Sequence, residues 1–374
     1  MSIEAQLHWN DGLLQSVDRL IVPESALAGD ERWQAAVKTL SQENMVWLDA
    51  APWIVPSGLA SARFPLAAFH LRKLAIPGRF YPRLAFPSLA QGPRDLKPVR
   101  LLARDDGQLV VDPNHPLAGL DVRLNLRPST LACAPRTRLT ELFEGSGMQR
   151  PLANPLAAYL GLDALSREDE EHDELFYRQP RFTEHLDAVC RAHITQLYAR
   201  LLLPVASVLD LMASWDSHLP EIPAPVHVAG LGLNGLELHA NSRLTERVVK
   251  DLNQRPDLPW SDAQFDSVVC TASIEYLVYP LEVIGEVRRV LKPGGIFIVT
   301  FSDRWFPPKA IRVWSELHPF ERAGLVASLL AKAGFEQLGS ETLRGLKRPE
   351  DDKYSSQRSF SDPLFAVWGR TPRA

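Results

Sequence analysis

The sequence predicts an α/β protein in which a doubly wound parallel sheet follows a smaller β-rich part. Three short apolar runs carry this prediction, at 205–211, 265–271 and 296–301. The last run follows a Lys-Pro-Gly-Gly turn at 292–295, which ends a segment of helical periodicity over 280–291. Buried strands that alternate with helices at this spacing favour a parallel sheet covered on both faces.

The composition restricts the class of protein. A chain of 374 residues is long enough for two domains, each with its own core. Its apolar fraction of 45% and charged fraction of 23% are those of an ordinary globular protein. The net charge of −4 does not indicate the basic surface that binds nucleic acids or anionic lipids, so we expect neither a nucleic-acid nor a membrane partner.

The cysteines and the apolar segments indicate a cytoplasmic protein. Cys133, Cys190 and Cys270 are far apart and odd in number, which predicts reduced, mostly buried thiols and no disulfide or metal site. Residues 1–6 show no export signal. The apolar segment 197–213 is interrupted by charged residues and a proline, so we do not expect it to cross a bilayer.

Residues 1–128 are predicted to form the β-rich module. Proline punctuates short extended segments here, and one helix is expected at about 29–40. The alternating runs 98–104 and 108–112 are separated by Asp-Asp-Gly, which predicts a β-hairpin. A turn and a further strand at 120–126 follow.

Part of this module resembles a known family. The hairpin, the sequence Asn114-His115-Pro116-Leu117-Ala118-Gly119 and the following strand resemble the C-terminal part of bacterial FKBP-type prolyl isomerases, over residues 97–128. The resemblance implies an α+β FKBP-like module. The upstream sequence does not show the aromatic cleft of an isomerase, so a partial or degenerate domain is expected. For His115, a hydrogen bond to the local backbone is favoured over metal or acid–base chemistry.

A connector is predicted between the two parts. Residues 129–175 are expected to form a linker, and their acidic run at 166–174 is typical of a solvated face. The segment 176–182 is expected to dock on the following domain. A helix is predicted to begin at Thr183 as its N-cap and to continue to Leu203.

A second resemblance covers residues 176–370. Its motifs are Val-Leu-Asp-Leu at 208–211, Asp251-Leu252-Asn253, Phe265-Asp266 and Leu291-Lys292-Pro293-Gly294-Gly295. These motifs resemble those of class I S-adenosylmethionine-dependent methyltransferases of the type 11 kind. The segments 176–182 and 215–220 are similar to a branch of that family from bacteria, algae and plants. The resemblance implies a Rossmann-like domain over 176–374 and S-adenosyl-L-methionine as the cofactor.

The resemblance also implies a set of cofactor-binding residues, although two positions depart from the pattern. The loop after the first strand contains no glycine, and Gly232 stands where a carboxylate usually binds the ribose. Asp251 is expected at the adenine amino group or, equally, as the cap of a turn. The predicted set is Arg181, Asp210, Met212, Ala213, Ser214, Asn234, Asp251, Leu252 and Ser273.

Methyl transfer needs donor and acceptor in line, and it needs a base only when the acceptor loses a proton. The candidate bases are His218 and His185, for which structural hydrogen bonding is the alternative, and Tyr276 is a candidate for acceptor contact. Helices at 309–318 and 320–334 and strands at 335–345 and 363–370 should complete the domain. A mobile polar loop is expected at 347–361.

The predicted function is therefore S-adenosylmethionine-dependent methylation of a small-molecule or protein acceptor that the sequence does not identify. Two alternatives remain open. One is a non-catalytic module that keeps the methyltransferase fold and binds a partner or altered ligand in a degenerate pocket. The other is a folding helper with prolyl isomerase activity in the amino-terminal module.

Overall fold

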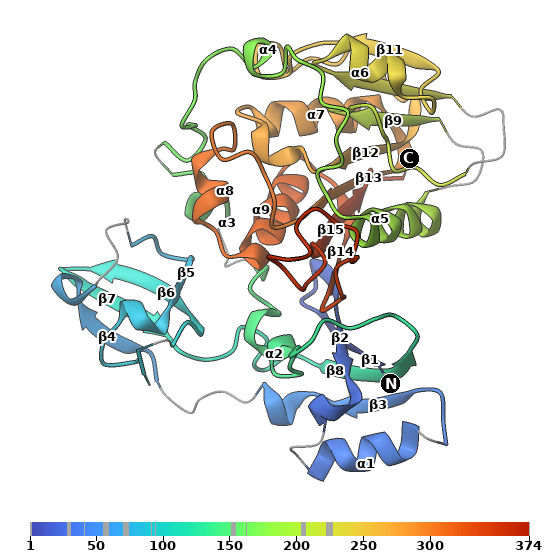
Figure 1. Cartoon of the computed structure of the whole chain (residues 1–374). Coiled ribbons are helices and arrows are strands. Elements are labelled where there is room, and N and C mark those ends of the chain that lie inside the picture. The colour runs from blue at the N-terminus through green and yellow to red at the C-terminus, as the bar shows by residue number, and fades with distance from the viewer. Residues whose placement is uncertain are drawn as a thin grey trace.

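A computed structural model of the chain describes residues 2–27, 31–40, 42–54, 60–69, 75–90, 92–93, 95–150, 155–161, 163–202, 207–221 and 227–373. The strands form one sheet of eleven strands and one of four. The large sheet extends from the carboxyl-terminal half at the top of Figure 1 down to the amino-terminal strands, and the small sheet lies to one side. Within the described residues, no helix has the length and apolar character needed to cross a membrane.

The carboxyl-terminal half of the large sheet has the order β11-β10-β9-β12-β13-β15-β14. The first five of these strands are parallel, and β15 is antiparallel to both of its neighbours. Their bounds are β9 Val208–Leu211, β10 Val228–Gly232, β11 Glu246–Val249, β12 Phe265–Thr271, β13 Leu291–Phe301, β14 Glu336–Arg344 and β15 Leu364–Arg370. The predicted α/β class is thereby confirmed. The predicted beginning of the first strand, 205–206, lies outside the described residues.

The segment Lys292–Gly295 differs from its prediction. The helix before it, α7 (Pro280–Val290), is present, but the four residues form an irregular part of β13 and not a turn between elements. Phe265 pairs with Leu291 and Ser267 pairs with Ile296, so one residue of β12 faces four of β13. The left-handed φ of 75° at Gly294 accommodates this bulge without steric cost.

Helices cover both faces of this half (Figure 1). One face packs against α5 (Ala188–Leu201) and α6 (Gly235–Ala240). The other packs against α7, α8 (Arg312–Glu316) and α9 (Pro319–Lys332). The prediction that the first of these helices begins at Thr183 is wrong, because the side chain of Asp187 accepts the Val189 and Cys190 N–H groups and is the N-cap.

The amino-terminal strands extend the same sheet. They follow β14 in the order β2 (Leu14–Pro23), β1 (Ser2–Asn10), β8 (Val122–Ser129) and β3 (Val46–Asp49). The junction is a parallel pairing of β14 with β2, from Leu338 with Leu14 to Arg344 with Leu20. Helices α1 (Glu31–Leu40) and α2 (Glu141–Gly145) pack near these strands, with 3₁₀ turns η1 (Glu24–Leu27) and η2 (Ala51–Trp53). The domain boundary at residue 128 stays a prediction, and one sheet runs across it.

The four-stranded sheet contains the predicted hairpin, formed by β6 (Pro98–Asp105) and β7 (Gln108–Asp112). Strands β4 (Ala62–Pro65) and β5 (Phe80–Pro82) flank it, followed by the 3₁₀ turns η3 (Leu66–Ala68) and η4 (Arg83–Ala85). The strand after the hairpin, β8, lies in the other sheet. His115 bonds to the local backbone as expected, because its Nδ1 accepts the Leu117 N–H at 3.1 Å. Its Nε2 lies 2.9 Å from the carbonyl oxygen of the more distant Phe143.

The predicted linker packs against the rest of the chain. It contains α2, α3 (Pro155–Tyr159) and α4 (Asp173–Phe176), and α3 packs on α9. The acidic run is solvated only in part, because Asp173 is buried and lies 3.2 Å from Nζ of the fully buried Lys309. Lys309 also contacts Asp169 and donates to the Glu171 carbonyl, so the run encloses a buried cation.

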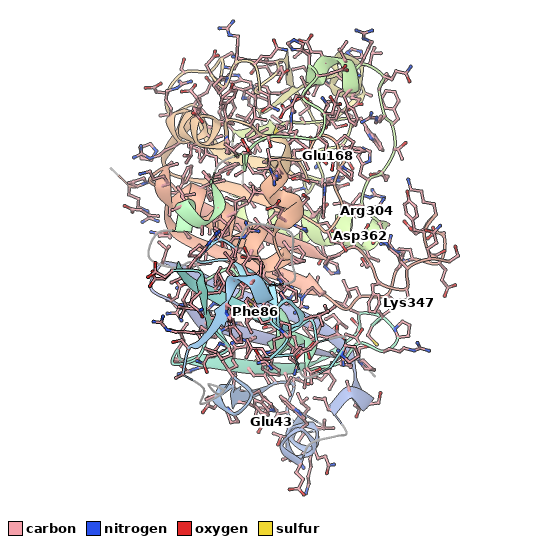
Figure 2. The ribbon with its side chains drawn as sticks, turned by 90° about the vertical axis from the view of Figure 1, so that its left-hand side faces the viewer. Glu43, Phe86, Glu168, Arg304, Lys347 and Asp362 are labelled. Atoms are coloured by element: carbon pink, nitrogen blue, oxygen red, sulfur yellow. The ribbon has the colours of Figure 1, made fainter. Side chains whose placement is uncertain are left out.

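The loop predicted to be mobile, 347–361, is held at its base by Arg348. This guanidinium is buried and pairs with Asp187, Asp352 and Asp362. Arg304 lies 3.6 Å from the same Asp362, and the two side chains are adjacent in Figure 2. Breaking a buried ion pair by removing one partner is costly, so these contacts restrict the base of the loop. The three cysteines are free thiols, and Cys190 and Cys270 are buried, as predicted.

Candidate functional site

The candidate site is a cavity of about 220 Å³ at the carboxyl ends of β9, β10 and β12. The chain moves from β9 outward to β10 and β11, and then returns to the other side of β9 with β12. Loops diverge at such a reversal, and ligands of open α/β sheets bind there. The segment before α5 and the residues after β13 complete the lining.

The structure brings all predicted site residues to this one cavity. The described lining includes Arg181, His185, Asp210, Met212, Ala213, Ser214, His218, Asn234, Asp251, Leu252, Ser273 and Tyr276. They come from five separate parts of the sequence, and only the fold brings them together. Their placement at the cavity is observed, while their individual roles stay predictions.

The glycine-free loop after β9 closes by using a glycine of the neighbouring strand. Met212 has a left-handed φ of 60°, and the Ala213 N–H donates to the Leu231 carbonyl at 2.7 Å. A Cβ added at Gly232 would collide with the Ala213 carbonyl oxygen. An acidic side chain at position 232 is therefore incompatible with this loop, which explains the missing ribose carboxylate.

Neither bulky residue of the loop fills the cavity. The Met212 side chain packs on the larger core of the sheet. The Trp215 ring lies edge-on to Phe182, with centroids 6.5 Å apart. Both residues line the cavity, and about 220 Å³ remains open between the walls.

Asp210, at the end of β9, is the most perturbed acid of the cavity. Its side chain is 3% exposed, and Oδ2 has no hydrogen-bond partner among the described residues. Burial raises the pKa of Asp210 to about 7, against a lowering by the Ser217 hydroxyl. A buried acceptor without a partner is unfavourable, and a cationic or N–H group of a ligand would satisfy it.

Asp216 and His218 form a pair in the same loop. Nδ1 of His218 lies 2.9 Å from Oδ2 of Asp216, and the Thr195 hydroxyl of α5 donates to the His218 carbonyl. The hydrogen bond with His218 lowers the pKa of Asp216 to about 2. A carboxylate on Nδ1 fixes the ring and its tautomer, so Nε2 is the nitrogen that can accept a proton.

Glu237 is a cavity residue that the sequence analysis missed. Its carboxylate accepts the Ser214 hydroxyl at 2.6 Å and the Arg181 backbone N–H at 2.7 Å. It thereby connects the loop after β9 with the segment before α5. The available signal was its spacing, because a Glu three residues after the capping Asn234 is typical of a helix start.

The polar side-chain atoms of Asn234 already make hydrogen bonds within the protein. Its Oδ1 caps α6 by accepting the Leu236 and Glu237 N–H groups. Its Nδ2 donates to the carbonyls of Tyr177 and Arg178, which confirms that the segment 176–182 docks on this domain. The predicted hydrogen bond from Asn234 to the ribose would therefore have to displace one of these contacts.

Arg181 lies among aromatic rings at the mouth of the cavity. Its guanidinium carbon is 4.4 Å from the centroid of Phe176 and 5.0 Å from that of Phe306. Nη2 donates to the Phe176 carbonyl, whereas the buried Nη1 has no hydrogen-bond partner among the described residues. A planar cation with a free N–H can bind a carboxylate of a ligand.

His185 and Tyr276 lie on the same side as Phe306. The His185 ring is 5.2 Å from the Phe306 ring, and burial lowers its pKa, so the ring is neutral near pH 7. The Tyr276 hydroxyl accepts the Phe306 N–H at 2.9 Å. Its neighbour Glu275 is fully buried outside the cavity, and burial raises the Glu275 pKa to about 7.

Asp251 is observed in one of its two expected roles, the cap of a turn, while its contact with adenine stays a prediction. Oδ1 accepts the Asn253 N–H at 2.8 Å, which is the turn-capping contact, and Oδ2 accepts from Gln254 at 3.1 Å. The residue also lines the cavity together with the buried Leu252. Ser273 donates to the Thr271 carbonyl at 2.9 Å. A ligand at Asp251 can be reached without breaking the turn.

Comparisons with known proteins agree with this placement. Residues 228–299, from the beginning of β10 into β13, match a family model described as a methyltransferase domain. The match supports the class I methyltransferase resemblance for the carboxyl-terminal half, and it does not extend to the amino-terminal strands.

Two curated proteins are similar over part of the same half. A probable S-adenosylmethionine-dependent methyltransferase of Mycolicibacterium smegmatis is 38% identical over 82 residues, which cover 21% of this chain and 32% of that protein. The ubiquinone/menaquinone biosynthesis C-methyltransferase of Laribacter hongkongensis is 31% identical over 97 residues, covering 25% and 38%. The chain thus spans about a third of the length of the curated relatives it matches.

A solved structure of an S-adenosylmethionine-dependent methyltransferase from Aquifex aeolicus is also similar. It is 16% identical to this chain, with a TM-score of 0.34, over 53% of this chain and 96% of that one.

Proposed function

We propose that this protein is an S-adenosylmethionine-dependent methyltransferase acting on a small-molecule or protein acceptor. The observation that carries the proposal is the cavity at the carboxyl ends of the strands, in a half that matches a methyltransferase model. The residues present fit the cofactor, because a buried carboxyl oxygen of Asp210 and a guanidinium N–H of Arg181 both lack partners among the described residues.

Three residues would hold the cofactor through its charged and polar groups. Asp210 faces the protonated amino group of its methionine part, and Arg181 its carboxylate. Asp251 accepts a hydrogen bond from the adenine amino group, with Leu252 against the ring. When bound, the cofactor supplies a methyl group already activated on a sulfonium, so the protein mainly positions the acceptor in line.

The Asp216–His218 pair supplies the base when the acceptor must lose a proton. Asp216 holds the imidazole through Nδ1, which leaves Nε2 to accept the proton, and the carboxylate stabilises the positive charge of the imidazolium that forms. His185 is the second candidate. Its place beside Phe306 and Tyr276 is suited to contact with the acceptor.

Calorimetry with S-adenosylmethionine and S-adenosylhomocysteine tests the binding part. We expect saturable binding of both by the full chain, weakened about tenfold in Arg181→Gln, since a charge-assisted hydrogen bond contributes about 1.5 kcal/mol or more. Arg138→Gln is a matched control, because Arg138 is exposed and pairs only with Glu141 and Glu144 among the described residues. Absence of heat with folded protein would leave the non-catalytic binding module.

Transfer of a labelled methyl group to a panel of small phenols, thiols and amines tests the chemical part. His218→Gln should lower turnover by about 100-fold, the usual contribution of a positioned base, while S-adenosylhomocysteine still binds. Asp216→Asn should lower turnover less and shift its pH profile. Equal turnover in both variants and the parent would assign the pair a structural role.

For the amino-terminal part we propose an FKBP-like module without a required isomerase role. The support is the β6–β7 hairpin and the backbone-bonded His115. The aromatic rings of Phe64, Phe69 and Phe86 pack on one another in the core of this sheet. A proline-peptide isomerisation assay on the full chain should give the uncatalysed rate. A cytoplasmic location is proposed from the three free thiols.

A further inference from the structure

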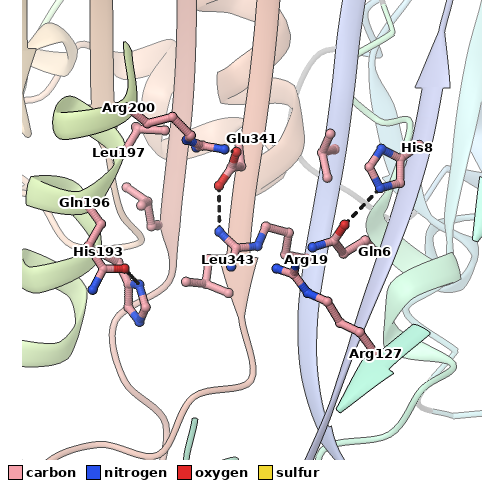
Figure 3. A pocket seen from close by; sticks show the side chains of 12 residues that line it. Gln6, His8, Arg19, Arg127, His193, Gln196, Leu197, Arg200, Glu341 and Leu343 are labelled. Atoms are coloured by element: carbon pink, nitrogen blue, oxygen red, sulfur yellow. Dashed lines mark hydrogen bonds and ion pairs between the residues drawn. The ribbon is translucent and has the colours of Figure 1, made fainter. Parts of the chain in front are cut away.

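A second cavity, of about 430 Å³, lies where the amino-terminal strands meet the carboxyl-terminal half. One wall is the sheet surface of β1, β2, β8, β14 and β15, and the other is α5 (Figure 3). We call it the arginine groove. It shares no lining residue with the cofactor cavity.

Five charged side chains form a continuous ladder along this groove. Arg127 lies 2.9 Å from Glu4, and Glu4 lies 2.6 Å from Arg19. Arg19 lies 2.8 Å from Glu341, which lies 2.7 Å from Arg200 of α5. Figure 3 shows Arg19 between Glu341 and Arg127. The ladder begins and ends on a cation, so three guanidinium groups face two carboxylates.

The carboxylates of the ladder are enclosed, whereas its terminal cations are open. The side chains of Glu4 and Glu341 are 5% and 6% exposed, but those of Arg127 and Arg200 are 43% and 55% exposed. Nη1 of Arg127 and both Nε and Nη1 of Arg200 have no hydrogen-bond partner among the described residues. The groove therefore presents unused cationic N–H groups while its negative charge is satisfied.

The rest of the lining is neutral and in part apolar. Burial lowers the pKa values of His8 and His193, so both rings are uncharged near pH 7. Gln6 and Gln196 hold these two rings by hydrogen bonds of 3.0 and 3.1 Å. The apolar part of the wall is formed by Val17, Leu197, Leu343 and Leu364.

We propose that the arginine groove binds a small organic anion, in which a carboxylate or phosphate pairs with Arg200 or Arg127. The apolar part of that ligand would contact the leucines of the wall. A volume of about 430 Å³ is within the usual range of small-molecule sites. Guanidinium groups that already carry one carboxylate are held in place, so little side-chain entropy is lost when they bind another.

Phenyl phosphate and benzoate are suitable probes. The first carries a phosphate and the second a carboxylate, and the apolar part of both is a phenyl ring. Titration of the full chain at low salt, followed by calorimetry, should give saturable binding of at least one of them, and phenol should not bind. The affinity should fall about tenfold in Arg200→Gln or in Arg127→Gln, whichever cation pairs with the acidic group, because that variant loses one charge-assisted contact. The preferred probe identifies the acidic group.

Arg138→Gln is the control for loss of one exposed positive charge, and it should bind the probe like the parent chain. S-adenosylhomocysteine should not compete with the probe, whatever its own affinity. Lack of saturable binding, equal affinity in all variants, or competition by S-adenosylhomocysteine would overturn the proposal. If a glutamine variant fails to fold, Arg200→Lys replaces it. Lysine keeps the positive charge but lacks the planar guanidinium group, so binding should still be weaker than in the parent chain.

Discussion

The two cavities differ in how their polar groups are satisfied. In the cofactor cavity, Oδ2 of Asp210 and Nη1 of Arg181 have no partner among the described residues. In the arginine groove, Glu4 and Glu341 each contact two arginines. The first arrangement leaves buried polar atoms that a ligand can satisfy, whereas the second is satisfied by the protein's own side chains.

This difference has a physical consequence. A buried polar group without a partner costs about 1 to 3 kcal/mol, so these two unpaired atoms lower the stability of the fold. A ligand that supplies the missing partners recovers this free energy and raises the melting temperature. The ladder of the groove instead links β8, β1, β2, β14 and α5, and it strengthens the junction of the two halves without a ligand.

The largest expected effect tests how the cofactor cavity is built. Gly232→Ala places a Cβ against the Ala213 carbonyl oxygen, which is backbone and cannot rotate away. We expect a loss of about 3 kcal/mol in the free energy of unfolding, measured with urea, and loss of S-adenosylhomocysteine binding.

The matched control is Gly285→Ala in α7, where a new Cβ meets nothing within 4 Å. Replacing a helical glycine by alanine should stabilise the protein by about 0.5 to 1 kcal/mol. Equal effects of the two substitutions would show that the loop after β9 does not depend on Gly232.

The second effect distinguishes the centre of the ladder from its end. Arg19→Gln removes the side chain that joins Glu4 to Glu341, and both acids are almost fully buried. We expect about 2 kcal/mol of destabilisation, because each acid keeps only one cationic partner. Arg127→Gln removes a half-exposed partner of Glu4 and should cost less than about 1 kcal/mol.

Urea unfolding of both variants measures the difference. The two values would be equal if the ladder contributed only through solvent-exposed pairs. A smaller loss for Arg19→Gln than for Arg127→Gln would show that the junction of β2 with β14 is held by the backbone pairing alone.

The parts of the fold that sequence reasoning predicted are those with local signals. Strand β12 was predicted with its observed bounds, because Phe265–Thr271 reads as a short strand-like run, and the hairpin followed from its Asp-Gly turn. The helix start at Asp187 was missed because Thr183 offers the same capping chemistry. Only the tertiary contacts of Asp187 with Ser361 and Asp362 distinguish the two.

The candidate site likewise has residues that the sequence predicted and contacts that it did not. Its residues were found because strand ends converge in a parallel sheet, which a sequence pattern can indicate. The roles of Gly232 and Glu237 could not be found, because they depend on contacts between separate loops. The pairing of β14 with β2 joins residues more than 300 positions apart, and neither strand carries a sign of its partner.

A third prediction concerns pH. The pKa of Asp210 is about 7 in the folded chain and 3.8 as a free side chain, so the folded state binds more protons in between. The free energy of unfolding should therefore fall as the pH rises from 5 to 8, and Asp210→Asn should remove about 1 to 2 kcal/mol of that fall. Urea titrations at the two pH values measure this.

The pKa of Glu275 is also about 7, so this acid contributes to the same decrease in the free energy of unfolding with pH. Glu275→Gln is therefore the comparison variant. S-adenosylhomocysteine should reduce this decrease in the parent chain, because the amino group of the ligand would pair with the ionised Asp210. It should not reduce the decrease in Asp210→Asn. An unchanged pH dependence in Asp210→Asn would contradict the burial of this acid and the unpaired state of its Oδ2 among the described residues.

The smallest effect on stability is expected at Asp251. Asp251→Asn keeps an oxygen that can accept the Asn253 N–H, so the free energy of unfolding should change by less than about 0.5 kcal/mol. The loss of charge should still weaken S-adenosylhomocysteine about five- to tenfold, because hydrogen bonds to a carboxylate are stronger than those to an amide. Calorimetry on the folded variant measures the affinity. Unaltered affinity together with a large loss of stability would leave Asp251 as the cap of its turn, and the adenine would then have to be recognised through backbone atoms.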